Sequence, residues 1–299
     1  MISMTQVALI STSDRLEGTT QAIDLLGINP VENKEVILKP NFNTADPPPA
    51  STSIDTLRSL ILKLREMGAK SIILAERSGP VNTQECFKDK GVFELAKELD
   101  FSLVDLSELS IEDFTLMMPE DSYWNKGFLF PNIYLKAESI VETCCLKTHH
   151  TGHFTISLKN ATGLVPRKNL NGNSYMRELH SSTDVRKMIA DINSVYKPHL
   201  IVLDGVSAFV DGGPAKGTQK EPNVFIAGTD KIAIDSVGVA ILRILGTTPE
   251  VSSGKIFDQE QIARAVELGL GISSADEIEI ITNSDESDKL AEQIYDQLL

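Results

Sequence analysis

Short, unbroken runs of large aliphatic residues recur along this chain, and segments with helical periodicity separate them. Val36–Leu38, Ile72–Leu74 and Leu200–Leu203 are the clearest of these runs. A continuous apolar run of this length is typical of a strand that is buried on both faces of a parallel sheet. Alternation of such strands with helices predicts an α/β fold, in which helices cover both faces of a mainly parallel sheet.

The segments between the runs show the helical pattern. After Ser51 and Ser53, either of which could cap a helix, six residues keep helical spacing, and Gly68 ends the pattern: Ile54, Leu57, Leu60, Ile61, Leu64 and Met67. Residues 232–245 are apolar on most faces, which predicts a buried helix. We expect residues 1–299 to form a single α/β domain. The least regular region, residues 107–135, is the place for an insertion or small subdomain.

The charge balance limits the partners of this protein. With 299 residues and a formal net charge of -14, the chain lacks the basic surface that nucleic acids and membrane surfaces attract. None of its apolar stretches approaches the roughly 18 residues of a membrane-spanning helix. Three cysteines, and no export signal in residues 1–10, predict a cytoplasmic protein. We therefore expect a small anionic partner, no nucleic acid and no membrane, and we leave a homo-oligomer open.

Polar residues follow several of the predicted strands. Open parallel sheets bind ligands beyond the carboxyl ends of their strands, so these residues are candidates for one shared site. They are Lys39, Asn41, Glu76, Lys147, His149, Asp204 and Asp230. If the strands are parallel neighbours, the side chains should converge on one rim of the sheet. The alternative is that strands simply end where polar residues begin.

The densest chemistry lies between residues 144 and 180, which hold four of the five histidines. Cations grouped in an acidic protein indicate a local anion site, and histidines beside them indicate proton transfer or metal ligation. We take His149, His180 and Lys147 as the candidate catalytic residues. To the ligand-binding candidates Lys39, Asn41, Glu76 and Asp204 this region adds Lys159, Asn160 and Arg167.

His149, His150 and His153 form an H-H-x-x-H pattern. Two histidines four residues apart could ligate a metal on a helix, but Gly152 weakens a helix here, and the motif has no glutamate of the zinc-protease type. Metal ligation, an acid–base or substrate-binding role for His149, and a structural role all stay open.

The cysteines favour structural roles. Cys144 and Cys145 are adjacent on a predicted strand and should therefore point to opposite faces, and the third cysteine, Cys86, is distant in sequence. Because an iron–sulfur cluster usually needs four thiolate ligands, we expect none.

A glycine-rich loop and three aspartates complete the candidates. In the loop at residues 211–217, Gly213 and Gly217 could let backbone amides approach an anion, although a plain surface loop would look the same. Asp235 lies on the apolar helix, where a carboxylate is costly unless it is paired. With Asp204 and Asp230 it could hold a divalent cation, and a purely structural partner is the alternative.

Taken in order, these motifs resemble a known family. The motifs are Lys147-Thr148-His149, Leu158-Lys159-Asn160 with Gly163, His180, Asp204-Gly205, Gly213-Pro214 with Gly217, and Gly228-Thr229-Asp230 through Asp235. Together they resemble the pattern of the domain-of-unknown-function family 362 over roughly residues 35 to 245, and Lys39-Pro40-Asn41 is similar to its N-terminal motif. Some members carry ferredoxin-like iron–sulfur segments, which implies electron transfer for them. Because this chain lacks such a cysteine run, that role does not carry over.

The leading functional hypothesis is an enzyme that acts on a small carboxylate or phosphate in a cleft of lysine, histidine and aspartate side chains. A non-catalytic protein that binds a metal or cofactor in the same cleft, for maturation or transport, is the alternative. A redox protein linked to an iron–sulfur cluster is disfavoured by the missing cysteines.

Overall fold

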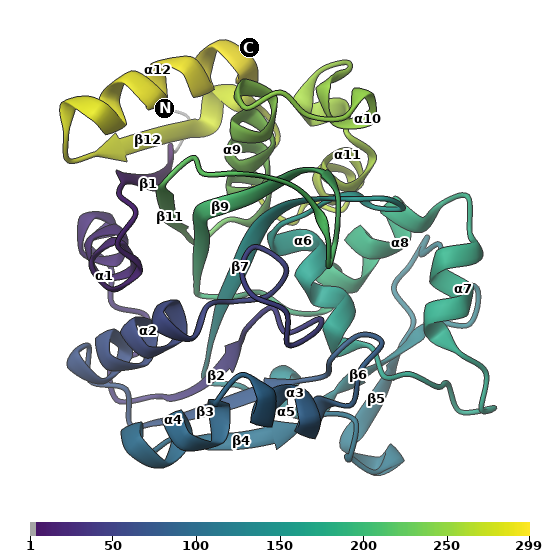
Figure 1. Ribbon diagram of the computed structural model, residues 1–299. Helices are drawn as coiled ribbons and strands as arrows, with labels where there is room; N and C mark the ends of the chain where they lie inside the picture. Colours follow the sequence, from purple (N-terminus) through teal and green to yellow (C-terminus); the bar gives the residue numbers. More distant parts are fainter. Residues whose placement is uncertain (1–3) are drawn as a thin grey trace.

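The apolar runs form the strands of one large sheet in the computed structural model, which describes residues 4–299 (Figure 1). Residues 1–3, which belong to the segment that was searched for an export signal, lie outside the described residues. Eight strands lie in the order β12 (Ile278–Thr282), β1 (Thr5–Ser11), β11 (Val224–Gly228), β9 (Leu200–Gly212), β7 (Ser139–His149), β2 (Glu35–Lys39), β3 (Ser71–Glu76) and β4 (Ser102–Asp105). Two short strands extend the sheet, β8 (His153–Thr155) beside β7 and β10 (Gly217–Lys220) beside β9.

The eight main strands are parallel to their neighbours except at β11, while the short strands β8 and β10 are antiparallel to β7 and β9. Strand β11 lies between β1 and β9 and runs antiparallel to both. The carboxyl ends of β1, β9, β7, β2 and β3 therefore meet at one edge of the sheet, while β11 ends at the opposite edge. The mainly parallel sheet was predicted correctly, but the reversed direction of β11 was not.

Helices cover both faces of the sheet, as the buried strands require (Figure 1). On one face pack α1 (Arg15–Leu26), α2 (Ile54–Glu66), α3 (Thr83–Asp89) and α4 (Val92–Leu99). On the other pack α8 (Val185–Ile192), α9 (Lys231–Ile244), α11 (Glu260–Glu267) and α12 (Asp285–Leu298). The alternation of strand side chains produces this arrangement, because Val36 and Leu38 join the first core and Ile37 joins the second. The predicted α/β class is confirmed.

The ends of α2 settle one open choice. The Ser53 hydroxyl accepts a hydrogen bond from the Asp55 amide at 3.2 Å, so Ser53 is the cap, while the Ser51 hydroxyl donates to the Thr44 carbonyl at 2.6 Å. Gly68, with a φ of 86°, follows the last turn of the helix as expected. None of the helices within residues 4–299 is long and apolar enough to cross a membrane.

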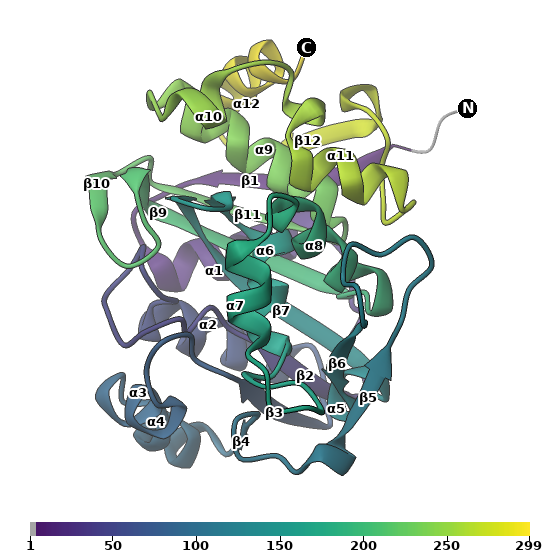
Figure 2. The same ribbon diagram turned by 90° about the vertical axis from the view of Figure 1, so that its right-hand side faces the viewer.

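The irregular region 107–135 forms a small sheet of its own at the side of the molecule (Figure 2). Its strands, β5 (Phe114–Met117) and β6 (Phe128–Pro131), are antiparallel, and the short helix α5 (Asn132–Leu135) follows them. Phe128 and Phe130 are buried in an aromatic cluster with Trp124 and Tyr134. This cluster covers the face of the sheet on the side of β2 and β3.

Three further short helices complete the fold: α6 (Ser157–Asn160), α7 (Tyr175–Ser181) and α10 (Pro249–Ser252). The position of α6 depends on Asp235, which is fully buried on α9. Its carboxylate accepts hydrogen bonds from the Ser157 amide at 2.8 Å and the Leu158 amide at 3.2 Å. Burial raises the pKa of Asp235 well above its usual value. The carboxylate on this apolar helix thus has a structural partner, the amino end of α6.

Replacement of Asp235 by alanine should therefore destabilise the fold. Asp235→Ala leaves two buried amides without an acceptor, and we expect a loss of about 2–3 kcal/mol in the free energy of unfolding measured by urea denaturation. Asp235→Asn keeps one acceptor oxygen and should lose clearly less. Equal losses in the two variants would contradict this role.

Candidate functional site

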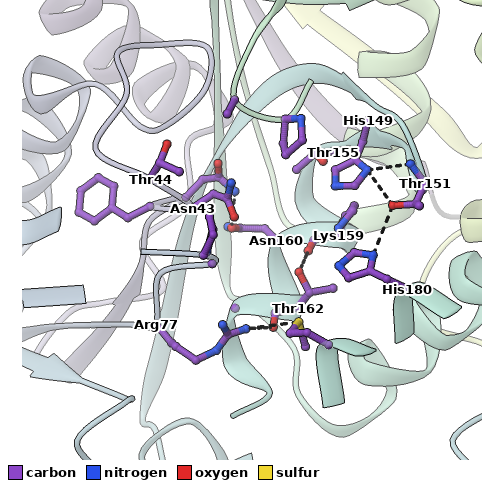
Figure 3. A pocket seen from close by; sticks show the side chains of 18 of the residues that line it. Asn43, Thr44, Arg77, His149, Thr151, Thr155, Lys159, Asn160, Thr162 and His180 are labelled. Atoms are coloured by element: carbon purple, nitrogen blue, oxygen red, sulfur yellow. Dashed lines mark hydrogen bonds between the residues drawn. The ribbon is translucent and has the colours of Figure 1, made fainter. Parts of the chain in front are cut away.

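A cavity of about 630 Å³ opens at the edge where the parallel strands end. Its walls come from the loops after β2, β3 and β9, the β7–β8 hairpin, α6 and α7 (Figure 3). Among the described residues, five cationic side chains and one carboxylate line it: Lys39, Arg77, Lys147, Lys159 and Arg167, with Glu76. In a chain with a net charge of -14, this cavity is a local excess of positive charge.

The floor of the cavity is a buried hydrogen-bond network. Lys39 Nζ lies 2.9 Å from Glu76 Oε2 and also donates to Asn160 Oδ1 at 3.2 Å. Asn41 Nδ2 donates to the same Asn160 oxygen at 2.9 Å. Since these residues come from β2 and the loop after it, the end of β3 and α6, the network ties these elements together.

Lys147 belongs to this network more than to the open cavity. It is fully buried, and its ammonium group donates to Asn41 Oδ1 at 2.8 Å and to the Ala50 carbonyl. Burial lowers its pKa. The ammonium group therefore holds the loop after β2 in place, and its hydrogen bonds are made within the protein.

Lys159 is different, although it is only 6% exposed. Within residues 4–299 its ammonium group makes neither a side-chain hydrogen bond nor an ion pair, and it lines the cavity. Burial, with the charges of Lys147 and Arg77, lowers its pKa to about 7. Gly152 packs against its stem, since a β-carbon there would lie 2.8 Å from Lys159 Cδ and Cε.

Arg77 is a cavity cation that the sequence analysis missed. It is 3% exposed and donates to the Ser78 carbonyl at 3.0 Å and the Thr162 carbonyl at 2.8 Å, while its Nε finds no acceptor. Burial lowers its pKa to about 10. The signal was available, because Arg77 directly follows Glu76 at the end of β3.

His149 is the last residue of β7; it is buried, at 7% exposure, and it also lines the cavity. Its Nδ1 accepts hydrogen bonds from the amides of Thr151 at 3.1 Å and Gly152 at 3.2 Å. We therefore assign the ring proton to Nε2. Burial, followed by the charge of Lys159, lowers the pKa of His149 far below its usual value. The ring is a neutral hydrogen-bond donor.

His180 lies on α7 with its ring almost parallel to that of His149, at a centroid distance of 6.3 Å. The Thr151 hydroxyl lies 3.2 Å from His149 Nδ1 and 3.4 Å from His180 Nδ1 (Figure 3). Partial burial, followed by the charge of Lys159, lowers the pKa of His180. Because His180 stays exposed to solvent, it can exchange protons with water beside Lys159.

The H-H-x-x-H pattern spans the β7–β8 hairpin, and a metal-binding helix does not form there. His150 stacks on His149 at 4.6 Å, with its Nδ1 3.1 Å from the Gly213 carbonyl oxygen. His153 is paired opposite His149 in the hairpin but does not line the cavity. The three histidines of the motif therefore do not point at one common ligand position.

The three aspartates proposed as metal ligands are separated. Asp204 lies at the predicted edge, but it bonds to Arg15 at 2.9 Å and Thr56 at 2.6 Å and does not line the cavity. Asp230 lies at the opposite edge because β11 is reversed, and it caps α9 through the Ala233 amide at 2.9 Å. Asp235 holds α6. In the part of the chain described, no three acidic, histidine or cysteine side chains come close enough to hold a metal ion.

In the glycine-rich loop, Gly213 and Gly217 do not line the cavity, whereas two residues between them do. Pro214 and Ala215 line the cavity. The Gly213 amide donates to the Lys216 carbonyl at 2.7 Å, so this amide is already used. Gly213 instead permits close packing, because a β-carbon there would lie 2.0 Å from the Thr148 carbonyl oxygen.

The remaining candidates are Arg167 and the cysteines. Arg167 lines the cavity mouth and donates to the Val81 carbonyl. Cys86, Cys144 and Cys145 are free and buried, and burial raises the pKa of each thiol. A raised thiol pKa disfavours the thiolate form, which metals and electrophiles require.

Comparison with known proteins identifies relatives of this chain. The family profile described as Domain of unknown function (DUF362) matches residues 36–240, which confirms the resemblance found in the sequence. A relative described as a thylakoid-associated protein of Synechocystis sp. is 23% identical over 211 residues, which cover 70% of this chain and 63% of that protein. Among solved structures, the lactate racemase apoprotein of Thermoanaerobacterium thermosaccharolyticum aligns with a TM-score of 0.49 at 10% identity, over 96% of this chain and 86% of that one.

Two substitutions should separate the structural role of His149 from its chemical role. His149→Ala removes the acceptor for two amides and should lower the free energy of unfolding by about 1–2 kcal/mol. In His149→Asn, the side-chain oxygen can replace Nδ1 as acceptor but leaves no Nε2. We expect thermal unfolding to show recovered stability in His149→Asn, and calorimetry to show weak ligand binding in both variants. If His149→Asn also recovers ligand binding, His149 has only a structural role in the turn and no chemical one.

Lys159 should lower the free energy of unfolding at low pH, and this effect should disappear at high pH. Its pKa is about 7 in the folded protein and 10.5 in the reference state, so below pH 7 the fold holds a buried charge. Between pH 7 and 10.5 the unfolded chain binds more protons, and this cost disappears as the pH rises. Lys159→Met should therefore be more stable than wild type by about 1–2 kcal/mol at pH 6, with little gain near pH 10. Urea denaturation at both pH values measures this, and an equal gain at both would refute the assignment.

Proposed function

We propose that this chain, which belongs to the family of the domain of unknown function 362, is an enzyme. It binds a small carboxylate or phosphate in the cavity and transfers a proton to or from the bound molecule. The observation that carries the proposal is the charge of the cavity. Of its five cations, Lys39 is the one that pairs with a carboxylate within residues 4–299. A buried cation without a counter-charge is costly, and a bound anion would remove that cost.

Each charged group has a distinct part in this proposal. Lys159 and Arg77 contact the anion, because both line the cavity and neither forms an ion pair within the described chain. Lys39 and Lys147 add positive potential from the floor and hold the loop after β2. Arg167 attracts the anion at the mouth.

Proton transfer falls to Lys159, with His180 as its link to solvent. An acid or base works best when its pKa is close to the working pH, and the pKa of Lys159 is about 7. His149 acts as a hydrogen-bond donor through Nε2, because its Nδ1 is occupied by two amides. A neutral imidazole in this state polarises a substrate oxygen and does not take up a proton at Nε2.

Anion binding should be coupled to proton uptake. At pH 8 the amine of Lys159 is mostly neutral, and an anion favours its protonated form, so binding of inorganic phosphate should take up close to one proton. At pH 6 the uptake at Lys159 should vanish, because the group is already charged. Above pH 7 the affinity for a given ionic form should fall toward about tenfold per pH unit. Calorimetry in buffers of different ionisation enthalpy measures the uptake.

Lys159→Met should abolish the proton uptake at Lys159 and weaken binding by roughly 1–3 kcal/mol. Lys70→Met, which removes an exposed lysine outside the cavity, is the matched control and should behave as wild type. Phosphate binding with unchanged proton uptake in Lys159→Met would show that another group receives the proton. Binding without turnover of any small acid, together with retained proton uptake, would favour the non-catalytic alternative.

A further inference from the structure

We propose that Lys159 is a nucleophile that forms an imine with the carbonyl carbon of a small 2-oxo acid bound in the cavity. This inference names the substrate class for the proposed function and rests on that function for the binding of the acid group. Its starting point is a comparison among the buried lysines of the chain.

Five lysines are buried within residues 4–299, and four of them are fully engaged. Lys39 pairs with Glu76, Lys63 with Asp24 and Glu66, and Lys231 with Glu142, while Lys147 donates to Asn41. Lys159 has no such partner, and of these five it is the one whose nitrogen is both free and in the cavity. An amine held by a carboxylate stays protonated, whereas a free amine in a cation-rich site can lose its proton and attack a carbonyl.

The surroundings of Lys159 suit a polar substrate with a reacting oxygen. The Thr155 hydroxyl lines the cavity, is buried and has no hydrogen-bond partner within the described chain. His149 offers its Nε2 proton, and Arg77 has an Nε without an acceptor. Donors of these kinds suit a molecule that has both a carboxylate and a carbonyl oxygen, as a 2-oxo acid has.

The fraction of neutral amine makes the attack selective. At pH 7 about half of Lys159 is neutral, given its pKa of about 7. For an exposed lysine with a pKa of about 10.4, the neutral fraction at pH 7 is below about one in a thousand. A carbonyl reagent at neutral pH should therefore find Lys159 before the surface lysines.

The chemical step balances without an oxidant or reductant. The neutral nitrogen forms a bond to the carbonyl carbon, and one nitrogen proton moves to the carbonyl oxygen to give a carbinolamine. The carbon–oxygen bond then breaks, and the oxygen leaves as water after it accepts a second proton from an acid. His180 beside Lys159, or solvent through it, supplies that proton. The product is a protonated imine, which makes C–H bonds on the adjacent carbon more acidic.

The test is reductive trapping. The protein is incubated at pH 7 with pyruvate and sodium cyanoborohydride, and intact-mass and peptide mass spectrometry locate the product. We expect one carboxyethyl group on the peptide that contains Lys159, formed at least tenfold faster than on any other lysine, and slowed by inorganic phosphate. Lys70→Met should label as wild type does. Labelling spread over exposed lysines, with Lys159 no faster than the rest, would overturn the inference.

Two variants keep the result interpretable. Lys159→Arg keeps the positive charge but cannot form an imine, so it should bind phosphate and yield no fast adduct. Gly152→Ala keeps the lysine but displaces its stem, and should slow labelling several-fold in a folded protein. Phosphate binding with proton uptake but no adduct in wild type would reject the imine and leave the proposed function standing. If folded wild-type protein neither binds phosphate nor forms the adduct, the imine and the proposed function are both rejected.

Discussion

The contact on which the site depends is the buried ion pair between Lys39 on β2 and Glu76 at the end of β3, joined by Asn160 on α6. A buried ion pair stabilises a fold only when its remaining donors and acceptors are satisfied. Here the Pro40 carbonyl and the Phe42 amide take those places, at 2.7 Å and 3.0 Å. Because the only carboxylate that lines the cavity is used in this way, no acidic group of the described wall is left for the remaining cations.

The parts of the site that could be predicted are those that follow from strand direction. Lys39, Glu76 and Lys147 come directly after apolar runs or at their ends, and parallel neighbours bring such residues together. Asp230 was misplaced because an apolar run such as Val224–Ala227 reads the same in either direction, and nothing local shows that β11 is antiparallel. The burial of His149 could not be predicted for a related reason: the β7–β8 hairpin is formed by pairing, which a local pattern does not show.

Lys159 and Asp235 show how stability and chemistry are separated in this fold. Asp235 is buried with its hydrogen bonds satisfied by the amides of α6, so its burial fixes a backbone segment. Lys159 is carried by that same segment but has no partner of its own within residues 4–299, so its burial is a cost to the folded state. Proteins tolerate local costs of this kind mainly at functional sites. The unpaired lysine is therefore better evidence for a ligand than any of the polar residues that are fully hydrogen-bonded.

The place of β1 in the sheet affects how the chain reaches its native state. β1 pairs with two strands that come much later in the sequence: Val7 pairs with Gly228 of β11, and Thr5 pairs with Ile278 of β12. Until more than two hundred residues have followed, both edges of this apolar strand lack their native partners. Pairings between such distant segments slow folding and leave strand edges open to aggregation. The nascent chain should thus be vulnerable to aggregation at β1 during synthesis, and chaperone dependence should concentrate on this strand.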